Sequence, residues 1–189
     1  MSDGGVVLRR CDGDRVRSDH ALRERIAAVY TTVFGEPPYE EPPDRGPRWA
    51  HGPLVRHAAL PGFELVCAER AGALLGFAYG AIGRDDSWFA GYIRERAPRE
   101  VAEAWLGGHG ELAELAVDPQ ERGRGVGGAL HDAVVEHLEQ LGTGRVILVT
   151  QRAATAARAL YAARGWRDLA ELAPGSVLMG LRFTKGDAG

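Results

Sequence analysis

The residues that most clearly suggest chemistry lie in a glycine-rich stretch, RGRGVGG, at positions 122–128. Glycine lets the backbone adopt positive φ angles and approach a ligand closely. Backbone N–H groups at the start of a helix favour an anion, and Arg122 and Arg124 can pair with phosphate. The stretch therefore predicts a phosphate-binding turn. The alternative is a glycine-rich helix start with two solvated arginines.

The same glycines formally match the G-x-G-x-x-G pattern of dinucleotide-binding proteins, at Gly123, Gly125 and Gly128. Residues 118–122, however, separate them from the preceding strand, and the region 146–151 has no acid to contact a ribose. The chain also ends too soon after Gly128 for a full doubly wound sheet. No Gly-Lys-Ser/Thr sequence is present to form a P-loop. A nicotinamide-dependent oxidoreductase is therefore disfavoured.

The elements that must position this turn follow from apolar periodicity and turn residues. Strands are expected at 5–10, 63–69, 74–82, 110–117, 145–150, 166–170 and 177–183. Helices are expected at 21–34, 98–106, 127–141 and 153–164, the last ended by Gly165. Hairpins come first and a strand–helix–strand unit follows, so we predict a mixed α/β (α+β) sheet in a single domain over residues 1–189.

Two long connections stand apart from these elements. Residues 35–62 hold seven of the ten prolines and are expected to be mostly loop, with one short helix near 48–58. Residues 84–109 form an insertion of mixed charge. Long loops in compact domains often serve function, so both are expected to shape a binding site. The alternative for each is a variable surface segment.

Two motifs together resemble the GNAT superfamily of acyl-CoA-dependent N-acetyltransferases. The first is Arg122-x-x-Gly125-x-Gly127, which follows a strand ending at Val117 and opens an amphipathic helix. The second is AARALYAARGWRDL at 156–169. The resemblance covers about 63–183. It implies a central, mostly antiparallel sheet with a splayed parallel strand pair, flanked by helices.

The resemblance also implies a donor, acetyl-CoA. The turn would hold the pyrophosphate through backbone amides, and the pantetheine arm would pair with the strand that ends at Val117, whose amide would face the thioester oxygen. The family often has Asn where this chain has Ala154, and Thr155 is a weak substitute. The implied donor-binding residues are Leu115, Ala116, Val117, Arg122, Gly123, Arg124, Gly125, Val126, Gly127 and Thr155.

Acyl transfer to an amine requires a base for the amine, a donor for the oxyanion and a proton for the departing thiolate. Glu111 and Glu114 are the candidate bases, and strict strand alternation places them on opposite faces unless a bulge intervenes. Tyr161 aligns with the family tyrosine near the sulfur and is the candidate acid. Each could instead be structural: a salt-bridged strand glutamate or a core aromatic.

Composition limits the remaining classes. The net charge is −3 and the pI near 6.1, so nothing indicates a nucleic-acid binder. Cys11 and Cys67 are expected to be free thiols in a reducing compartment. No signal peptide or membrane span is expected, which favours a cytoplasmic protein. The six histidines show no metal-ligand spacing, so no metal site is expected.

The sequence therefore favours an N-acetyltransferase that acts on a primary amine of a small molecule or a peptide. A different class stays open, namely an acyl-CoA-binding regulatory or catalytically degenerate domain. The retained Glu111 and Tyr161 weigh against that class, and Ala154 weighs slightly for it. Neither the identity of the acceptor nor the oligomeric state can be predicted, although many relatives are homodimers.

Overall fold

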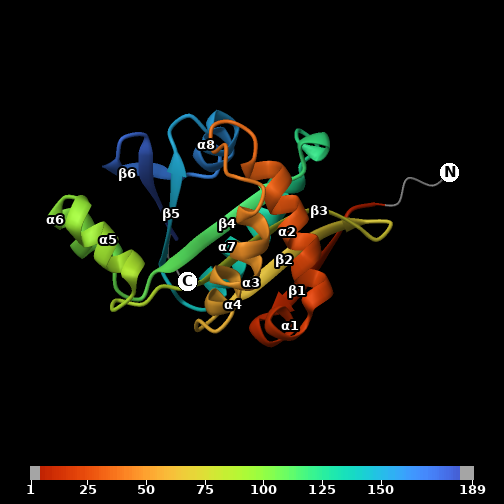
Figure 1. Cartoon of the computed structure of the whole chain (residues 1–189). Helices are drawn as coiled ribbons and strands as arrows, with labels where there is room; N and C mark the ends of the chain where they lie inside the picture. The colour runs from red at the N-terminus through yellow and green to blue at the C-terminus, as the bar shows by residue number, and fades with distance from the viewer. Residues whose placement is uncertain (1–4, 184–189) are drawn as a thin grey trace, which may run out of the picture.

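A single seven-stranded sheet organises the chain, and the computed structural model describes residues 5–183 of it (Figure 1). The strands run in the order β1-β2-β3-β4-β5-β7-β6. Their bounds are β1 Val7–Asp12, β2 Glu64–Arg70, β3 Ala73–Ile82, β4 Gly110–Val117, β5 Arg145–Gln151, β6 Arg167–Ala173 and β7 Ser176–Arg182. The expected mixed sheet is confirmed.

The one parallel pair among these strands, β4 with β5, is unusually short. It is paired only at Gly110–Val146 and Glu111–Ile147, whereas the antiparallel pair of β5 with β7 extends over the whole of β5. Beyond Glu111 the two strands part, and the gap widens toward the end of β4. The splayed pair that the family resemblance implies is therefore present.

Helices cover both faces of the sheet. On one face lie α1 Gly13–Ser18, α2 His20–Phe34, α3 Arg45–His51 and α4 Pro53–His57, whose core includes Phe77 and Tyr79 of β3. On the other lies α7 Val126–Gln140, whose core includes the alternate residue Ala78. The two cores follow from strand alternation, since successive side chains point to opposite faces.

The remaining helices lie toward one end of the sheet. α5 Trp88–Arg96 and α6 Arg99–Trp105 pack beside β5, β6 and β7, and α8 Thr155–Ala162 follows β5 (Figure 1). No helix within residues 5–183 is both long enough and apolar enough to span a bilayer.

Two helices were not expected from the sequence, and both lack a regular apolar stripe. α1 is six residues long and buries only Val16. α5 buries Ala90 and Ile93, while its first residue, Trp88, is 78% exposed. The segment 35–62 forms two helices, α3 and α4, in place of the single one expected. Four of its prolines precede α3, Pro47 lies in the first turn of α3, Pro53 begins α4 and Pro61 follows α4, so none interrupts a helix interior.

Candidate active site

A β-bulge in β4 sets the direction of the two candidate bases. Tyr79 of β3 pairs with Glu114, but the next residue, Gly80, pairs with Leu112, so Ala113 is an extra residue on β4. A bulge reverses the alternation beyond it. Leu112 lies in the core under α7, so Glu111 and Glu114 both face the α2–α4 side. Strict alternation would place them on opposite faces, but the bulge that the sequence left open is present and puts them on one face.

The end of β4 presents an open main-chain edge to the gap left by β5. Asp118 N–H donates to the Leu75 carbonyl at 2.8 Å, and this bond fixes which residues of β4 direct their N–H and C=O groups toward β3. Because the bonding direction alternates in an antiparallel pair, Ala116 also faces β3, while the N–H and C=O groups of Leu115 and Val117 point away from it. β5 pairs with neither residue. An extended ligand could bind there as an added strand.

The glycine-rich turn follows a short 3-10 helix at Pro119–Glu121, and its glycines have two different roles. Gly123 and Gly125 have φ angles of +74° and +83°, and a Cβ on either would meet no atom within 4 Å, so the space outside the turn is free. Gly127 and Gly128 instead lie under α8, where an added Cβ would come within 3.2 Å of Leu160 and 2.4 Å of Arg164. Only the first two therefore shape the ligand-facing turn.

The arginines of the turn are already paired with carboxylates. Arg122 donates to Glu36 at 2.8 Å, and Arg124 lies 3.6 Å from Glu121, which also accepts from Arg70 at 3.0 Å. Both turn arginines are about half exposed, at 46% and 61% of the side chain. Such exposed pairs are weak, so an incoming phosphate can compete for these guanidinium groups. Glu36 comes from the α2–α3 loop, which thus contacts the turn.

Glu114 lies deep between the sheet and the α2–α3 segment. Protein surrounds it except for a small opening to solvent, and this burial, together with the nearby Glu41 carboxylate, raises its pKa from 4.5 to about 8 despite the opposing charge of Arg45. Glu41 itself has a buried oxygen, Oε2, without a hydrogen-bond partner, 3.7 Å from Arg45 Nε. Two carboxyl groups and one arginine thus share this part of the site.

Glu111 lies where β4 and β5 part. Its Oε1 is 3.1 Å from Nε2 of His109, a side chain with no exposed surface. On the neighbouring strand the Tyr79 hydroxyl is 2.8 Å from Nδ1 of His57. Burial, helped by the negative charges of Glu114 and Glu111, raises the pKa of Tyr79. The charges of both glutamates therefore act on one tyrosine, as expected if they share a face.

Tyr161, on α8, approaches the same region from the other side of the gap. It is 7% exposed, and burial, followed by the influence of Tyr39 and Glu114, raises its pKa, so its phenol stays protonated at neutral pH. Trp166 packs against its ring and donates from Nε1 to His131 at 2.8 Å. Thr155, the first residue of α8, makes no side-chain cap there.

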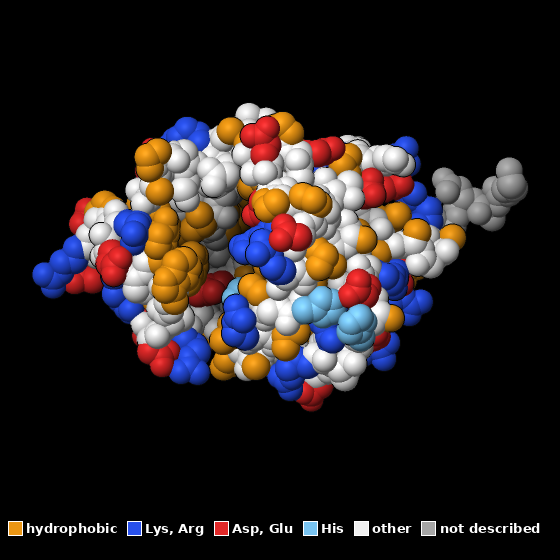
Figure 2. Space-filling view, in the orientation of Figure 1, with side chains coloured by type: hydrophobic (Ala, Val, Ile, Leu, Met, Phe, Trp, Pro, Cys, Tyr) orange, Lys and Arg blue, Asp and Glu red, His pale blue; other side chains and the backbone are white. Residues whose placement is uncertain are grey.

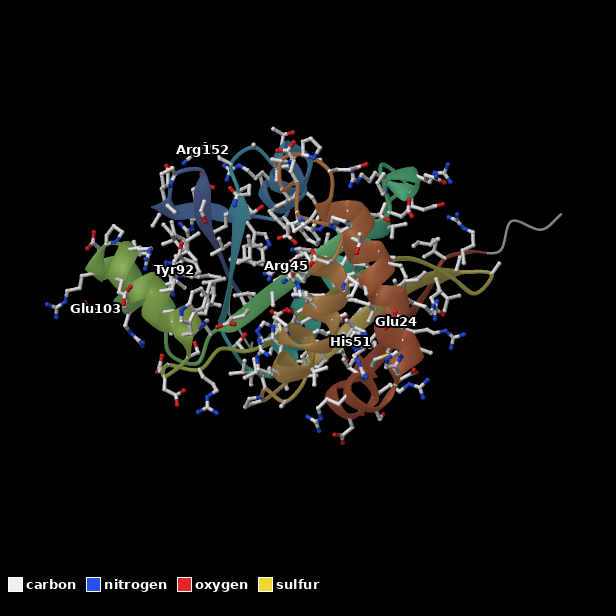
Figure 3. All side chains as sticks on the ribbon, in the orientation of Figure 1. Glu24, Arg45, His51, Tyr92, Glu103 and Arg152 are labelled. Carbon is white, nitrogen blue, oxygen red and sulfur yellow. The ribbon has the colours of Figure 1, made fainter. Side chains whose placement is uncertain are left out.

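The face that contains these groups is hollowed. Figure 2 shows a depression with acidic side chains in its floor, bordered by apolar side chains on one side and basic ones on the other. Figure 3 places Tyr92 of α5 and Arg45 of α3 on opposite sides of β5, with Arg45 over β4. The two residues come from the two long connections, and that these connections shape a binding site stays a prediction. A separate cavity of about 540 Å³, lined by Asp85, Arg94 and Glu103 among others, includes none of the groups above.

One further cluster lies outside the cleft and was not apparent from sequence spacing. His20 and Glu24 of α2 and His51 of α3 bring three ligand atoms within 4.8 Å of one another, on an exposed surface (Figure 3). His51 Nε2 is 2.6 Å from Glu24 Oε1, and Arg23 donates to Nδ1 of the same ring. Both nitrogens of His51 thus have hydrogen-bond partners, so we interpret the cluster as a surface hydrogen-bond network.

Comparison with known proteins agrees with this geometry. The profile of the acetyltransferase (GNAT) family matches residues 23–166, which include both candidate bases, the glycine-rich turn and Tyr161. The chain belongs to the GNAT family. Among curated relatives of this GNAT protein, a mycothiol acetyltransferase of Thermobispora bispora is 34% identical over 131 residues, or 68% of this chain and 39% of that enzyme. The chain thus spans well under half of that relative.

Solved GNAT structures share the fold over nearly the whole chain. The PaiA N-acetyltransferase of Thermoplasma acidophilum, solved in complex with coenzyme A, superimposes with a TM-score of 0.64 at 12% identity and covers 95% of this chain and 99% of its own. The ribosomal-protein-S18-alanine N-acetyltransferase of Escherichia coli has the same TM-score at 14% identity, with 98% and 99% covered. At such identities the likeness shows the fold alone.

Proposed function

We propose that this GNAT protein transfers an acetyl group from acetyl-CoA to a primary amine of a small molecule or a peptide. The observation that carries the proposal is the open edge of β4. The main-chain groups of Leu115 and Val117 face the gap where β5 departs, and the edge is followed, after a short 3-10 helix, by the turn with Gly123 and Gly125. The edge suits the pantetheine arm, and the turn, with the N-terminus of α7, suits the pyrophosphate.

The acceptor amine must be neutral to attack. We assign the base to Glu111, acting through water, because its carboxyl group lies at the point where the strands part and the side chain keeps 15% of its surface exposed. The amine nitrogen forms a bond to the thioester carbonyl carbon, and its proton passes to the carboxylate. A backbone N–H near Val117 donates to the oxyanion.

Collapse of the tetrahedral intermediate breaks the carbon–sulfur bond. The electron pair leaves with sulfur, and Tyr161 donates its proton to the thiolate. The raised pKa of this phenol keeps it protonated until the thiolate forms. The products are the acetylated amine and coenzyme A, and no covalent enzyme intermediate is required.

Glu114 has a different part in this proposal. Its pKa of about 8 leaves it mostly protonated at neutral pH in the free protein. A cationic amine placed beside it would favour the ionised form, because an opposite charge stabilises a carboxylate. We therefore assign Glu114 to binding of the acceptor ammonium group, with Glu41 as its neighbour.

The proposal is tested by thermal unfolding with acetyl-CoA, CoA, NADH and NADPH. A ligand at about 100 times its dissociation constant stabilises the fold by about 2.7 kcal/mol, which gives a clear shift in Tm. We expect shifts with the two CoA species only. A shift with a nicotinamide alone would contradict the assignment of the turn.

Thiol release is then measured with a panel of amines. The panel includes the acceptor of mycothiol acetyltransferase and a peptide with an N-terminal alanine, because these correspond to the relatives named above. Acetyl-CoA binding without thiol release over a broad panel would support the second candidate, an acyl-CoA-binding domain without turnover.

A further inference from the structure

We infer that His109 is a positioning residue for Glu111, and that Gly83 is a glycine because this pair occupies the space of a side chain. The inference rests on the proposed function only in assigning Glu111 as the base. The structural part, a buried histidine that holds the ionised carboxylate in one orientation, is independent of any reaction.

The first observation is the hydrogen-bonding state of His109. The ring is entirely buried, its Nε2 lies 3.1 Å from Glu111 Oε1, and its Nδ1 has no hydrogen-bond partner. With the proton on Nδ1, a buried N–H would lack an acceptor, and two lone pairs would face each other at Nε2. The neutral ring therefore carries its proton on Nε2 and donates to Glu111.

The unpartnered Nδ1 indicates what this side chain is for. Buried polar atoms are almost always paired, so an orphaned one calls for an explanation. An apolar residue would fill the same volume without that penalty. A histidine at this position gains its hydrogen bond to Glu111 and no other side-chain hydrogen bond, so we assign the residue to that carboxylate.

The second observation concerns Gly83, which follows β3 and lies against the pair. Its N–H donates to the His109 carbonyl at 2.8 Å, so the two backbones are fixed against each other. A Cβ on Gly83 would be 2.2 Å from His109 Nε2 and 2.6 Å from Glu111 Oε1. Any side chain at residue 83 would therefore displace both partners of the hydrogen bond, and no positive φ accounts for this glycine.

Few other groups compete for the carboxylate. Besides His109, the charge of Glu111 acts on two titratable groups, Tyr79 of β3 and His57 of α4, and its partner on β5, Ile147, is apolar. No hydrogen bond links Glu111 to any of them in the described residues. Oε2 is neither hydrogen-bonded nor buried there, so His109 holds one oxygen while the other faces the cleft.

The test compares His109→Gln with His109→Leu. The glutamine amide nitrogen takes the position of Nε2 and can donate, whereas leucine fills the space without a donor. The carboxyl carbon of Glu111 is followed by NMR in protein labelled with ¹³C-glutamate, and Glu111→Gln identifies its signal. At neutral pH we expect His109→Leu to move this signal away from its wild-type chemical shift, because the hydrogen bond to Oε1 is lost. His109→Gln should stay close to wild type.

Activity supplies the second measurement. If Glu111 is the base, kcat/KM falls in His109→Leu and is restored in His109→Gln. Gly83→Ala should lower kcat, while Gly5→Ala, ahead of β1, whose added methyl meets no atom within 4 Å, should not. An unchanged chemical shift of the Glu111 carboxyl carbon in His109→Leu would overturn the inference. A changed chemical shift with full activity in Glu111→Gln would uphold it and overturn the assignment of the base.

Discussion

The two sides of the cleft are built in different ways. The proposed donor side consists of the end of β4, the turn at 122–128 and the start of α7, and it offers mainly backbone N–H and C=O groups. The proposed acceptor side consists of the α2–α4 segment and α5, and it offers side chains such as Arg45 and Tyr92 (Figure 3).

This difference separates the groups proposed to bind the cofactor, which many chains could share, from the groups proposed to select the acceptor amine. Backbone groups on the donor side can bind the same cofactor in any chain that keeps the glycines and the splayed strands. Side chains on the acceptor side, with Glu41 and Glu114 in a shared buried environment, define the charge of the amine that fits. Changes on the two sides should therefore affect different kinetic constants, with the carboxylates between them affecting turnover.

The largest effect is expected from Glu111→Gln. Loss of a general base typically costs 10²–10⁴-fold in rate, so kcat should fall by about that factor at neutral pH with the KM for acetyl-CoA little changed. Glu114→Gln should instead raise mainly the KM for a cationic acceptor. Steady-state kinetics of both variants would separate the roles. A large loss of kcat in Glu114→Gln alone would reverse the assignment of the two glutamates.

The next effect concerns the donor side. Gly125→Ala should raise the KM for acetyl-CoA at least tenfold, because a non-glycine residue at a φ of +83° is strained and its methyl group enters the ligand space. Gly142→Ala is the matched control, with a φ of +77° and the same open surroundings, just beyond the opposite end of α7.

Both of these variants should lose about 1–2 kcal/mol of stability from the strain. Only Gly125→Ala should lose affinity for CoA, as measured by calorimetry. Equal CoA affinity in the two variants would remove the turn from the donor site.

A smaller effect concerns stability and pH. The pKa of Glu114 is raised from 4.5 to about 8 in the folded protein, so the folded state binds this proton more tightly than the unfolded state does. The contribution of this group to stability is therefore greatest below pH 4.5 and is lost as the pH rises to about 8. Glutamine stays neutral throughout, so Glu114→Gln should gain stability over wild type between pH 5 and 9.

Urea unfolding at those two pH values would measure this gain. Glu139→Gln, at an exposed position on α7, serves as the control and should show no such trend. A difference in unfolding free energy between Glu114→Gln and wild type that does not change with pH would mean that Glu114 is ionised at neutral pH. It would exclude a protonated Glu114 that ionises when a cationic amine binds.

The smallest effect lies away from both sides, in β1 and β2. A hydrogen bond from Cys67 lowers the pKa of the Cys11 thiol from 9.0 to about 7, while the pKa of the buried Cys67 is raised. Alkylation by iodoacetamide should modify Cys11 with a half-maximal rate near pH 7 and leave Cys67 unmodified in the folded protein. Cys67→Ala should return the midpoint of Cys11 toward that of an ordinary thiol. If the midpoint does not change in Cys67→Ala, the positive charge of Arg15 would account for the lowered pKa of Cys11.

The comparison of the two sides also explains how far the sequence could be interpreted. β4, β5 and α7 were predicted almost to the residue, because each has a regular apolar pattern bounded by glycine or proline. The bulge at Ala113 was not predicted, since the register depends on pairing with Tyr79 and Gly80 on another strand. The approach of Glu36 to Arg122 and of Glu41 to Glu114 joins segments far apart in the chain, which single-sequence patterns do not report.

The central claim is that the end of β4 is an open edge that pairs with the donor. Amide hydrogen exchange measured with and without CoA tests it residue by residue. The amides of Leu115 and Val117 should exchange fast in the free protein and slow markedly with CoA, while Ala116, which faces β3, should be protected in both states. Protection of Leu115 and Val117 without ligand, or no change on adding saturating CoA, would contradict the account.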